Sequence, residues 1–312
     1  MSIIYLPLYP VFLLASWLTA FVPPRVGHAA AWALASVTYW LLPNRRKVMG
    51  ANYAPVVGKS PDHPDVKRLG WLSFRGFARY LYEFLSFPHR SIDEMDARVS
   101  LFVRDDFMQA RAQGKGMIFV SAHFGNMDYA GVAIARRMVP MTIVADMLKP
   151  KRLMDHLVEF RSKKGLNVVY LAKAPRAILR ALKNNEAVGF LVDVGCNRDD
   201  GIPVTFFGRR TRFSAGPALL ALRTGAPIVV GYALVVGDRI EGHSYPPIYA
   251  VPTGNKAEDA RRCSQMIANY FEDFIGRYPE QWYIYRPMWG PETQCASLAD
   301  EQTLQEPAID AV

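Results

Sequence analysis

Short apolar runs alternate with amphipathic segments along the middle of the chain, and this alternation constrains the fold more than any other feature. The apolar runs have the length of buried strands. The strands that we expect lie at 117–120, 141–146, 167–170, 187–192 and 228–236. Strands that alternate with helices in this way form a largely parallel sheet. The sequence therefore predicts an α/β fold, a single domain at 49–290 whose largely parallel central sheet is flanked by helices.

The most informative stretch is 117–131, where a predicted strand gives way to a predicted helix. The apolar run stops before His123, and Gly125 and Asn126 then supply a turn and a helix N-cap. His123 therefore lies at the carboxyl end of a strand, where open α/β sheets bind their ligands. Asp128 falls in the first turn of the helix, from which its carboxylate can turn back and hold the imidazole. Such an arrangement is a general base with the group that orients it.

The spacing of His123 and Asp128 is weak evidence by itself. With six His and 28 acidic residues, the pattern His-x4-Asp/Glu should occur about half a time by chance. The pattern occurs twice, because His89 precedes Glu94 by the same interval. His89 follows no predicted strand, and we interpret it as a surface residue. For His123, spacing and context leave a second interpretation open, a strand-end histidine bonded to a helix cap.

A further acidic residue, Asp193, occupies a place equivalent to that of His123. It follows the apolar run 187–192, so it also lies at the carboxyl end of a predicted strand. Because ligands of open α/β sheets bind at these carboxyl ends, Asp193 and His123 can face the same crevice. The alternative is that Asp193 caps a helix or lies in a surface loop.

The N-terminal segment is almost uncharged. Residues 1–43 contain a single charged side chain, Arg25, and a basic cluster follows at 45–47. No basic stretch precedes the apolar run, which argues against a secretory signal peptide. Because prolines interrupt its start, we favour apolar membrane-attachment helices at 1–48 that lie in the interface, with the basic cluster facing lipid headgroups. A single spanning helix and an ordinary buried helical hairpin are the alternatives.

Most of the positive charge is concentrated in one segment. The net charge is +9, and 149–183 holds ten Lys or Arg against only Asp155 and Glu159. So local an excess suits a phosphate-bearing substrate or an anionic membrane surface. Nucleic acid is the competing interpretation, but the sequence has no helix-turn-helix, zinc-finger or RNP-type pattern, and we expect no nucleic-acid partner. The residues that we expect to bind substrate are Asn126, Lys149, Arg161, Lys164, Arg209 and Arg212.

Several classes of protein are excluded by what the sequence lacks. Three widely spaced Cys form neither a disulfide framework nor a zinc site, and we expect no metal. The sequence has no P-loop, no Gly-rich dinucleotide motif and no Gly-x-Ser-x-Gly elbow, and the missing elbow argues against a serine lipase or thioesterase. The last residues, 291–312, are acidic and offer little to bury, which predicts a flexible tail.

Taken together, these stretches resemble the bacterial lysophospholipid acyltransferase family that contains the lipid A late acyltransferases and the phosphatidylinositol mannoside acyltransferases. The resemblance covers about residues 1–290 and rests on motifs that occur in a fixed order. These motifs are the apolar N-terminus with Arg45-Arg-Lys47 and Asn52, then His123-Phe-Gly-Asn-Met-Asp128, Arg161-Ser-Lys-Lys-Gly165, the strand before Asp193, Phe206-Phe-Gly-Arg209, the segment 216–227 and Tyr278-Pro-Glu-Gln-Trp282. Each motif is weak singly, but the ordered set is specific.

The resemblance implies an α/β fold and a catalytic His-x4-Asp/Glu pair, which here is His123 and Asp128. It implies an acyl-CoA or acyl-carrier-protein donor, no cofactor, and a lipid or glycolipid acceptor at the cytoplasmic face of the bacterial plasma membrane. Asp128 stands where many lipid A enzymes have Glu, which favours the mannoside branch. That branch also suggests an acidic partner on a later strand, for which Asp193 is the candidate.

These features predict direct acyl transfer without an acyl-enzyme. His123 would take the proton of a hydroxyl as it attacks a thioester carbonyl, with Asp128 fixing the imidazole tautomer. Backbone N–H groups near Asn126 would bind the oxyanion, and Arg161 with neighbouring lysines would bind substrate phosphates. Two rivals stay open. One is a non-catalytic protein that binds anionic membranes, and the other is a hydrolase that uses His123 on a thioester or lipid.

Overall fold

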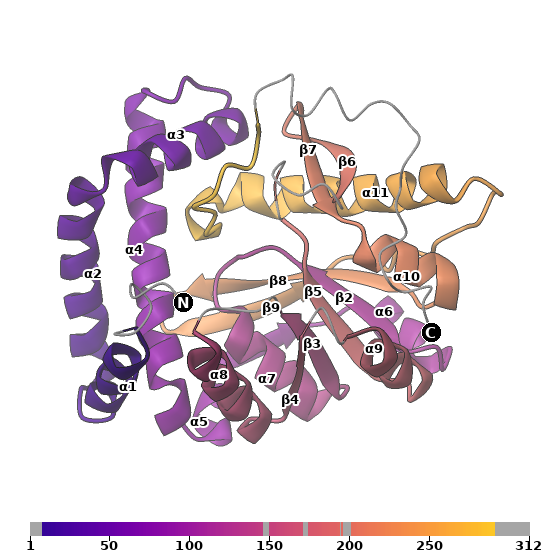
Figure 1. The fold of residues 1–312 in the computed structure, drawn as a ribbon, viewed down its shortest axis with the longest axis horizontal. Coiled ribbons are helices and arrows are strands. Elements are labelled where there is room, and N and C mark those ends of the chain that lie inside the picture. The colour runs from indigo at the N-terminus through magenta and orange to yellow at the C-terminus, as the bar shows by residue number, and fades with distance from the viewer. Residues whose placement is uncertain (1–7, 146–149, 171–173, 194, 196–200, 291–312) are drawn as a thin grey trace.

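The computed structural model describes residues 8–145, 150–170, 174–193, 195 and 201–290 (Figure 1). Within these residues, seven strands form one sheet in the order β1-β9-β8-β2-β5-β3-β4. The strands are β1 (Val99–Phe102), β2 (Met117–Ser121), β3 (Met141–Ala145), β4 (Leu166–Tyr170), β5 (Ala187–Leu191), β8 (Ile228–Val236) and β9 (Arg239–Ser244). Neighbouring strands are parallel except β8 and β9. The predicted α/β fold with a largely parallel central sheet is confirmed.

The central strands are buried on both faces, as continuous apolar runs in a parallel sheet predict. In β2, Met117 packs into one core cluster and Ile118 into the other. The same division recurs in β8, where Ile228 and Val229 enter opposite clusters. Because successive side chains of a strand point to opposite faces, the two clusters are the cores above and below the sheet.

Helices cover both faces of the sheet (Figure 1). The helices that share one core cluster are α5 (Ile92–Ala97), α6 (Asp105–Ala112), α7 (Met127–Arg137) and α8 (Lys151–Lys163). Those that share the other are α9 (Ala174–Lys183), α10 (Gly216–Thr224) and α11 (Lys256–Arg277). A separate antiparallel ribbon, β6 (Gly201–Phe206) and β7 (Arg209–Ser214), lies near α11.

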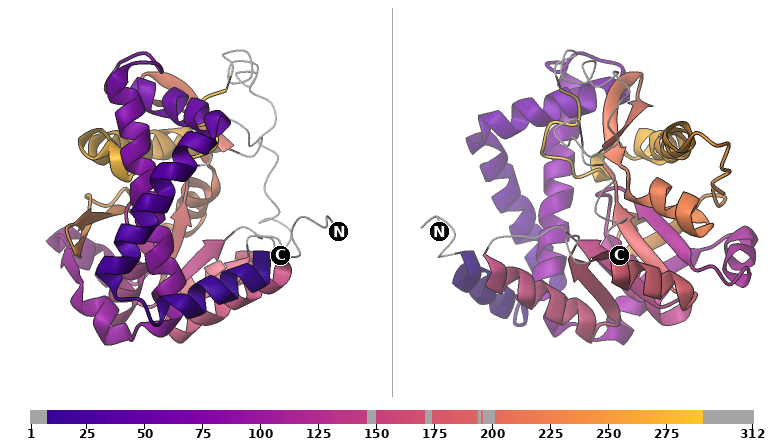
Figure 2. Two further views of the ribbon diagram at one scale, coloured as in Figure 1. Left: turned by 90° about the vertical axis from the view of Figure 1, so that its left-hand side faces the viewer. Right: turned by 45° about the vertical axis from the view of Figure 1, so that its right-hand side comes forward.

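Helices from the N-terminal part of the chain stand along one end of the sheet (Figures 1 and 2). They are α1 (Leu8–Thr19), α2 (Pro24–Leu41), α3 (Pro43–Val57) and α4 (Pro64–Ser86). Three of them begin with Pro, whose fixed φ suits the first helical position. Helix α4 packs against α1, α2 and α3, while α1 also packs against α8 and α3 against α11, so these helices meet the rest of the chain at several places.

The outer faces of α1 and α2 are apolar and exposed. On a water-soluble helix pair we would expect polar side chains at these positions. The exposed apolar residues of α1 and α2 and the turns that follow them are Val11, Leu14, Trp17, Leu18, Phe21, Val26, Trp32, Leu34, Val37, Trp40, Leu41 and Leu42. Within the described residues, no helix combines the length and the hydropathy needed to cross a bilayer.

The predicted and observed elements differ in the strands at one edge of the sheet and near residue 48, and one prediction is not tested. Strands β1 and β9 were not among the expected strands, and β9 alternates polar with apolar residues because one of its faces is only partly buried. The boundary predicted after residue 48 falls inside α3 (Pro43–Val57). The predicted flexible tail, 291–312, lies outside the described residues.

Candidate active site

The loop between β2 and α7 places His123 at the carboxyl edge of the sheet. Strand β2 ends at Ser121 and α7 begins at Met127. Gly125, between them, has a φ of 55°, and a Cβ there would lie 1.7 Å from the carbonyl oxygen of Ala233. A side chain cannot be accommodated at this turn, so the glycine is required for the path of the loop.

The imidazole of His123 is held by a carboxylate from the neighbouring strand. Its Nδ1 lies 2.8 Å from Oδ1 of Asp193, and its backbone N–H donates to Oδ2 of the same carboxylate at 3.0 Å. Asp193 follows β5, which pairs in parallel with β2, so the two residues meet at one edge of the sheet. Trp282 Nε1 donates a further hydrogen bond to Asp193 at 3.0 Å.

The charge on Asp193 is stabilised by these partners. Burial by itself would raise the pKa of this fully buried carboxyl, but the His123 imidazole and the hydrogen bonds from His123 and Trp282 lower the pKa below its ordinary value. A carboxylate that accepts from Nδ1–H fixes the tautomer of a histidine and leaves Nε2 as the basic nitrogen. The side chain of His123 is 35% exposed and lines a cavity, so its ring is accessible to a ligand.

Asp128 has other partners than the imidazole that we expected it to hold. Its carboxylate accepts hydrogen bonds from Nε and Nη2 of Arg161, at 2.8 and 3.3 Å, and from the hydroxyl of Tyr80, at 2.7 Å. A guanidinium that donates twice is a stronger partner for a buried carboxylate than a single ring nitrogen. The structure therefore corrects the expected orienter: the carboxylate bonded to His123 is that of Asp193.

In the cluster of Asp128, Arg161 and Tyr80, the contacts between the side chains favour a charged Arg161 and a neutral Tyr80. Burial by itself would lower the pKa of Arg161, but the Asp128 charge and hydrogen bonds raise it. Burial and then the Asp128 charge raise the pKa of Tyr80 well above its ordinary value. Tyr80 is therefore a neutral donor, and Arg161 and Asp128 form a buried ion pair that joins α8 to the first turn of α7.

Backbone N–H groups at the start of α7 are partly used by the fold. The N–H of Gly125 donates to Gln281 O at 2.9 Å, and that of Asn126 donates to Ala233 O at 3.3 Å. Across the part of the chain that the structure describes, the first two N–H groups of the helix, those of Met127 and Asp128, donate no hydrogen bond within the protein. These two groups are free to bind an anion at the positive end of the helix.

A cavity of about 680 Å³ opens beside His123. This volume lies within the range of pockets that bind small organic ligands. Its walls come from the sheet and from α4, α6, α7, α8, α9 and α10. They are mainly apolar, so they suit a hydrocarbon ligand. Representative apolar residues of the wall are Phe119, Ile134, Met141, Ile143, Ile178 and Leu220.

Polar groups from several elements line the same cavity as His123. They include Ser121, Tyr80, Asp128, Arg161, Tyr283 and Arg286. The cavity is thus lined by the imidazole of His123, by the buried ion pair of Asp128 and Arg161, and by the exposed cation Arg286. Across the described residues, no three His, Cys, Asp or Glu side chains cluster as metal ligands do.

The segment that follows α11 covers one side of His123. The N–H of Tyr283 donates to His123 O at 2.7 Å, and Phe124 pairs with Trp282 in an antiparallel bridge. Arg286 donates from Nη2 to the backbone oxygen of Asp193 at 3.3 Å and is exposed. Trp282 is the last residue of the motif Tyr278-Pro-Glu-Gln-Trp282, but no pattern in the sequence marked Tyr80, Tyr283 or Arg286 as site residues.

The residues expected to bind substrate are only partly brought together. Among the described residues, Arg161 lines the cavity and Asn126 does not. Asn126 is buried, its Oδ1 accepts from the N–H of Tyr129 at 3.1 Å as the N-cap of α7, and its Nδ2 donates to Glu83. Asn126 therefore shapes the loop and has no contact with the cavity.

The other predicted cations lie elsewhere. Lys149 is outside the described residues. Lys164 donates to the backbone oxygen of Arg90, and Arg212 donates to that of Gly201. Arg209 is exposed on the β6–β7 ribbon, and none of the described cations in this group lines the cavity. The positive charge of the sequence is thus spread over several surfaces of the fold.

The second His-x4-Glu pair is structural. Ser91 Oγ accepts from the N–H of Glu94 at 3.0 Å, and Glu94 Oε2 accepts from the N–H of Ser91 at 2.8 Å, which is a capping box at the start of α5. His89 is exposed and precedes this cap, in agreement with its interpretation as a surface residue. The His-x4-Asp/Glu spacing therefore marks a helix cap at His89 and Glu94, and two residues of the cavity wall at His123 and Asp128.

Comparisons with known proteins agree on one group. Residues 5–290 match a family model described as bacterial lipid A biosynthesis acyltransferase. The chain is 29% identical over 296 residues to a phosphatidylinositol mannoside acyltransferase of Mycolicibacterium smegmatis, a match that covers 89% of this chain and 93% of the relative. Phosphatidylinositol mannoside acyltransferases from two strains of Mycobacterium tuberculosis are each 30% identical over 246 residues, which is 76% of this chain and 75% of each relative.

Proposed function

The chain belongs to the bacterial lipid A biosynthesis acyltransferase family, and from this premise we propose that it moves a fatty acyl chain from an acyl thioester to a hydroxyl of a lipid or glycolipid. The donor is acyl-CoA or acyl carrier protein. The relatives are named for a mannoside of phosphatidylinositol, which supports a membrane glycolipid as the acceptor. The observation that carries the proposal is the His123–Asp193 pair at the wall of an apolar cavity.

His123 acts as the general base. Its Nε2 takes the proton of the acceptor hydroxyl while the hydroxyl oxygen attacks the thioester carbonyl carbon. Asp193 holds the ring through Nδ1 and stabilises the imidazolium that forms. The tetrahedral intermediate then breaks its C–S bond, and the imidazolium returns the proton to the departing thiolate. The products are an ester and a free thiol, and a base of this kind contributes about 10²- to 10⁴-fold to the rate.

The oxyanion of the tetrahedral intermediate needs donors that are fixed before the reaction. The unbonded N–H groups at the start of α7 are the candidates, because they adjoin the loop that carries His123. The positive end of the helix favours an anion at this place. The Asp128–Arg161 pair holds α8 against the same helix turn and thereby keeps these N–H groups in place.

The apolar cavity receives the acyl chain. Its walls are fixed by the packed sheet and by α7, so the chain enters a space that already exists. Arg286 is the exposed cation at the rim of this cavity, beside the backbone of Asp193. Its position suits a phosphate of the donor or the phosphodiester of the acceptor. Arg161 is neutralised by Asp128 and is less suited to that task.

The exposed apolar face of α1 and α2 is the surface that meets the lipid. Aromatic side chains such as Trp17 and Trp40 prefer the interface between headgroups and acyl chains. Arg25 is exposed at the start of α2, Lys47 is exposed in the second turn of α3, and Arg46 stacks over the ring of Trp40. Cations beside an apolar face favour anionic headgroups. We place the protein as a peripheral enzyme at the cytoplasmic face of the bacterial plasma membrane.

The test is a product analysis with purified protein. Acyl-CoA and acyl carrier protein, each labelled in the acyl chain, are incubated with a bacterial lipid extract, and the lipids are separated by chromatography. Acylated lipid is expected to appear as donor is consumed. Free fatty acid without acylated lipid would instead indicate a hydrolase.

Binding to anionic vesicles without consumption of either donor would indicate a membrane-binding protein. The substitution His123→Ala is expected to abolish transfer while the circular dichroism spectrum and vesicle binding are unchanged. Transfer by this variant at the wild-type rate would overturn the proposed mechanism.

A further inference from the structure

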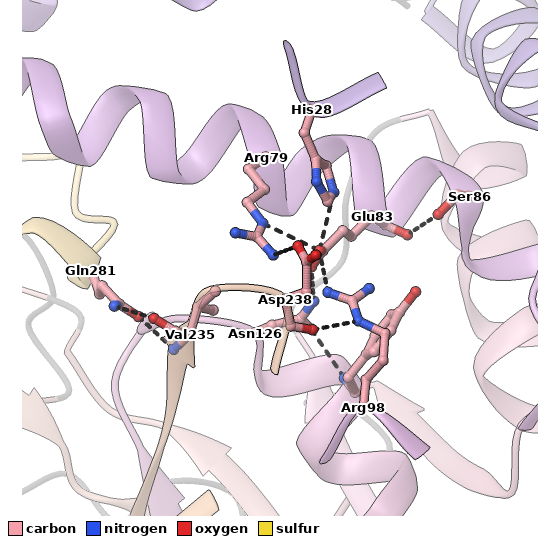
Figure 3. Close-up of polar contacts among 10 residues, drawn as sticks. His28, Arg79, Glu83, Ser86, Arg98, Asn126, Val235, Asp238 and Gln281 are labelled. Carbon is pink, nitrogen blue, oxygen red and sulfur yellow. Dashed lines mark hydrogen bonds and ion pairs between the residues drawn. The ribbon is translucent and has the colours of Figure 1, made fainter. Parts of the chain in front are cut away.

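Glu83, on α4, is a buried carboxylate at which several distant parts of the chain meet (Figure 3). Its Oε1 lies 3.2 Å from Nε2 of His28 on α2, 2.8 Å from Nη2 of Arg98 before β1, and 3.3 Å from Nε of Arg79 on α4 itself. Its Oε2 accepts from Nδ2 of Asn126, at the start of α7. One side chain thus links the N-terminal helices, the edge of the sheet and the loop of His123.

The charge of Glu83 is retained in spite of its burial. Burial by itself would raise the pKa, but His28, Arg98 and Arg79 lower the pKa to about 2. Removing one member of such a cluster leaves the others buried without their partner. The charged members of the cluster therefore depend on Glu83 for their buried partner.

Asn126 connects Glu83 to the candidate active site. Both polar atoms of its side chain are hydrogen-bonded: Nδ2 donates to Glu83, and Oδ1 accepts from the N–H of Tyr129. Its own backbone N–H donates to Ala233 O. Asn126 stands between His123 and the first N–H groups of α7, so any rotation of its side chain changes the loop that carries both.

A second bond network holds the loop from the opposite side and does not involve Glu83. Gln281 binds the backbone of Val235 through both polar atoms of its side chain, at 2.8 and 2.9 Å (Figure 3). Its backbone carbonyl oxygen accepts from the N–H of Gly125. The loop is therefore clamped between the Gln281 segment and Glu83. Loss of either clamp would leave the loop attached on one side.

Glu83 makes no contact with the space where substrate would bind. Among the described residues that line the cavity, neither Glu83 nor any of its four side-chain partners is present. Stability alone is a weak reason for a buried ion cluster, because apolar residues of similar volume often serve as well. An effect of Glu83 on the reaction must therefore act through the position of other groups.

We propose that Glu83 is a positioning residue: through Asn126 it sets the loop that carries His123 and the oxyanion donors, and through His28 it ties that loop to α2, whose outer face is apolar and exposed. The inference rests on the proposed acyl transfer, because it assigns Glu83 a part in that reaction. It needs no contact between Glu83 and either substrate.

The first test is the variant Glu83→Gln, which keeps the shape of the side chain and removes its charge. Measured per folded molecule, kcat is expected to fall about 10- to 100-fold, since small misplacements of catalytic groups cost that much. KM for both substrates is expected to stay within about twofold, because the cavity walls are unchanged. An unchanged kcat, or a loss that lies wholly in KM, would overturn the proposal.

A second variant covers the case in which Glu83→Gln does not fold. Asn126→Ser retains an N-cap for α7, because Ser caps as well as Asn, but its side chain is too short to reach Glu83. Its kcat is expected to fall in the same way. In the double variant the two effects should not add, since both remove one link. A folded Asn126→Ser variant with wild-type kcat would overturn the proposal by itself.

The matched control is Asp259→Asn. Asp259 is also a buried carboxylate, with bonds to Thr253 and Arg262, but it lies at the start of α11 and outside the loop network. The substitution Asp259→Asn should lower thermal stability without changing kcat per folded molecule. If its kcat fell as far as that of Glu83→Gln at equal loss of stability, the effect of Glu83 would be general and the proposal wrong.

A spectroscopic measurement separates this inference from the proposed function. The Nδ1–H proton of His123 reports its hydrogen bond to Asp193 in the NMR spectrum without any turnover. Glu83→Gln and Asn126→Ser are expected to shift this resonance, whereas Asp259→Asn is not. Acyl transfer by the wild type together with an unmoved resonance would defeat the inference alone. A shifted resonance with no transfer by the wild type would defeat the proposed function alone and uphold the link from Glu83 to His123.

Discussion

The imidazole Nδ1 of His123 and the carboxylate Oδ1 of Asp193 lie 2.8 Å apart, although 70 residues separate them in the sequence. Adjacent parallel strands, β2 and β5, end beside each other and bring the two together. The two acidic residues considered as partners of His123 therefore have different contacts. The carboxylate of Asp193 binds the imidazole of His123, whereas the carboxylate of Asp128 forms an ion pair with Arg161.

The substitution Asp193→Asn is expected to lower kcat about 10³- to 10⁴-fold. An amide in this place no longer holds the Nδ1–H tautomer or stabilises the imidazolium. The measurement is the steady-state rate of acyl transfer, normalised to the folded fraction by circular dichroism. A rate within tenfold of the wild type would show that Asp193 does not orient the base.

The substitution Asp128→Asn should act chiefly on stability. It leaves the guanidinium of Arg161 buried without its charged partner, which costs on the order of 3 kcal/mol of unfolding free energy. Urea denaturation measures this loss. Per folded molecule, kcat should fall less than in Asp193→Asn. If kcat fell further than in Asp193→Asn, Asp128 would be the functional partner of His123, as the sequence spacing indicated.

Acid should remove the contribution of Glu83 to stability. The pKa of this carboxyl is about 2 in the folded protein, against an ordinary value of 4.5. Between these values the unfolded chain binds more protons, so the stabilisation is complete above about pH 4.5 and is lost as the pH falls towards about 2. The shift corresponds to about 3 kcal/mol.

The measurement for Glu83 is urea unfolding of the wild type and Glu83→Gln at a series of pH values. The difference in unfolding free energy should be constant near neutral pH and should shrink in that acid window. Contributions of other carboxylates cancel in the comparison. A difference that does not change with pH would contradict the assignment of a charged Glu83.

Charges placed on the exposed face of α2 should weaken lipid binding. Leu34 and Trp40 are 69% and 68% exposed, and replacement of either by Glu removes apolar area from the interface and adds a charge that anionic lipid repels. Affinity for anionic vesicles, measured by sedimentation, is expected to fall about tenfold or more. The control is Val251→Glu, which adds the same charge at a position outside α1 and α2 that is 62% exposed. Equal binding by all variants would contradict the assignment of this face.

Filling the cavity at Gly189 should shift the preference for acyl chains. A Cβ at this strand position would lie 3.8 Å from Met141 Sδ, an ordinary contact, so Gly189→Val is expected to fold. Its methyl groups occupy space in the cavity wall that the donor chain would use. Comparison of kcat/KM for a series of acyl-CoA lengths should show a preference moved to shorter chains, by about 0.8 kcal/mol for each methylene excluded. An unchanged length profile would mean that the acyl chain binds elsewhere.

Much of the fold was readable from local patterns. The apolar runs marked β2, β3, β4, β5 and β8 to within about two residues. The apolar signal is continuous in β2, β5 and β8 because these strands are buried on both faces, whereas β4 lies at the edge of the sheet and is only partly buried. The glycine and asparagine after β2 marked the turn and the cap of α7. The position of His123 at a strand end followed from the same local signals.

The contacts of the cations and the strands at one edge of the sheet were harder to predict. Lys164 and Arg212 read as substrate-binding residues from charge alone, but each is bonded to a backbone carbonyl in the fold. Strand β9 carries too many polar residues for its burial to be seen in sequence. Charge density in a sequence does not say which surface a side chain reaches, because that depends on the packing of the helix that carries it.

The sequence by itself determined that a histidine stands at the carboxyl end of a buried parallel strand, because strand burial, turn chemistry and helix capping are local properties of the chain. Only the tertiary structure decided which carboxylate holds that histidine. Asp128 is near in sequence, but Arg161 and Tyr80 come from α8 and α4 and bind it, whereas Asp193 is distant in sequence and is delivered by the neighbouring strand. The partner of a buried charge is set by competition among groups that meet only when the sheet and its helices pack together.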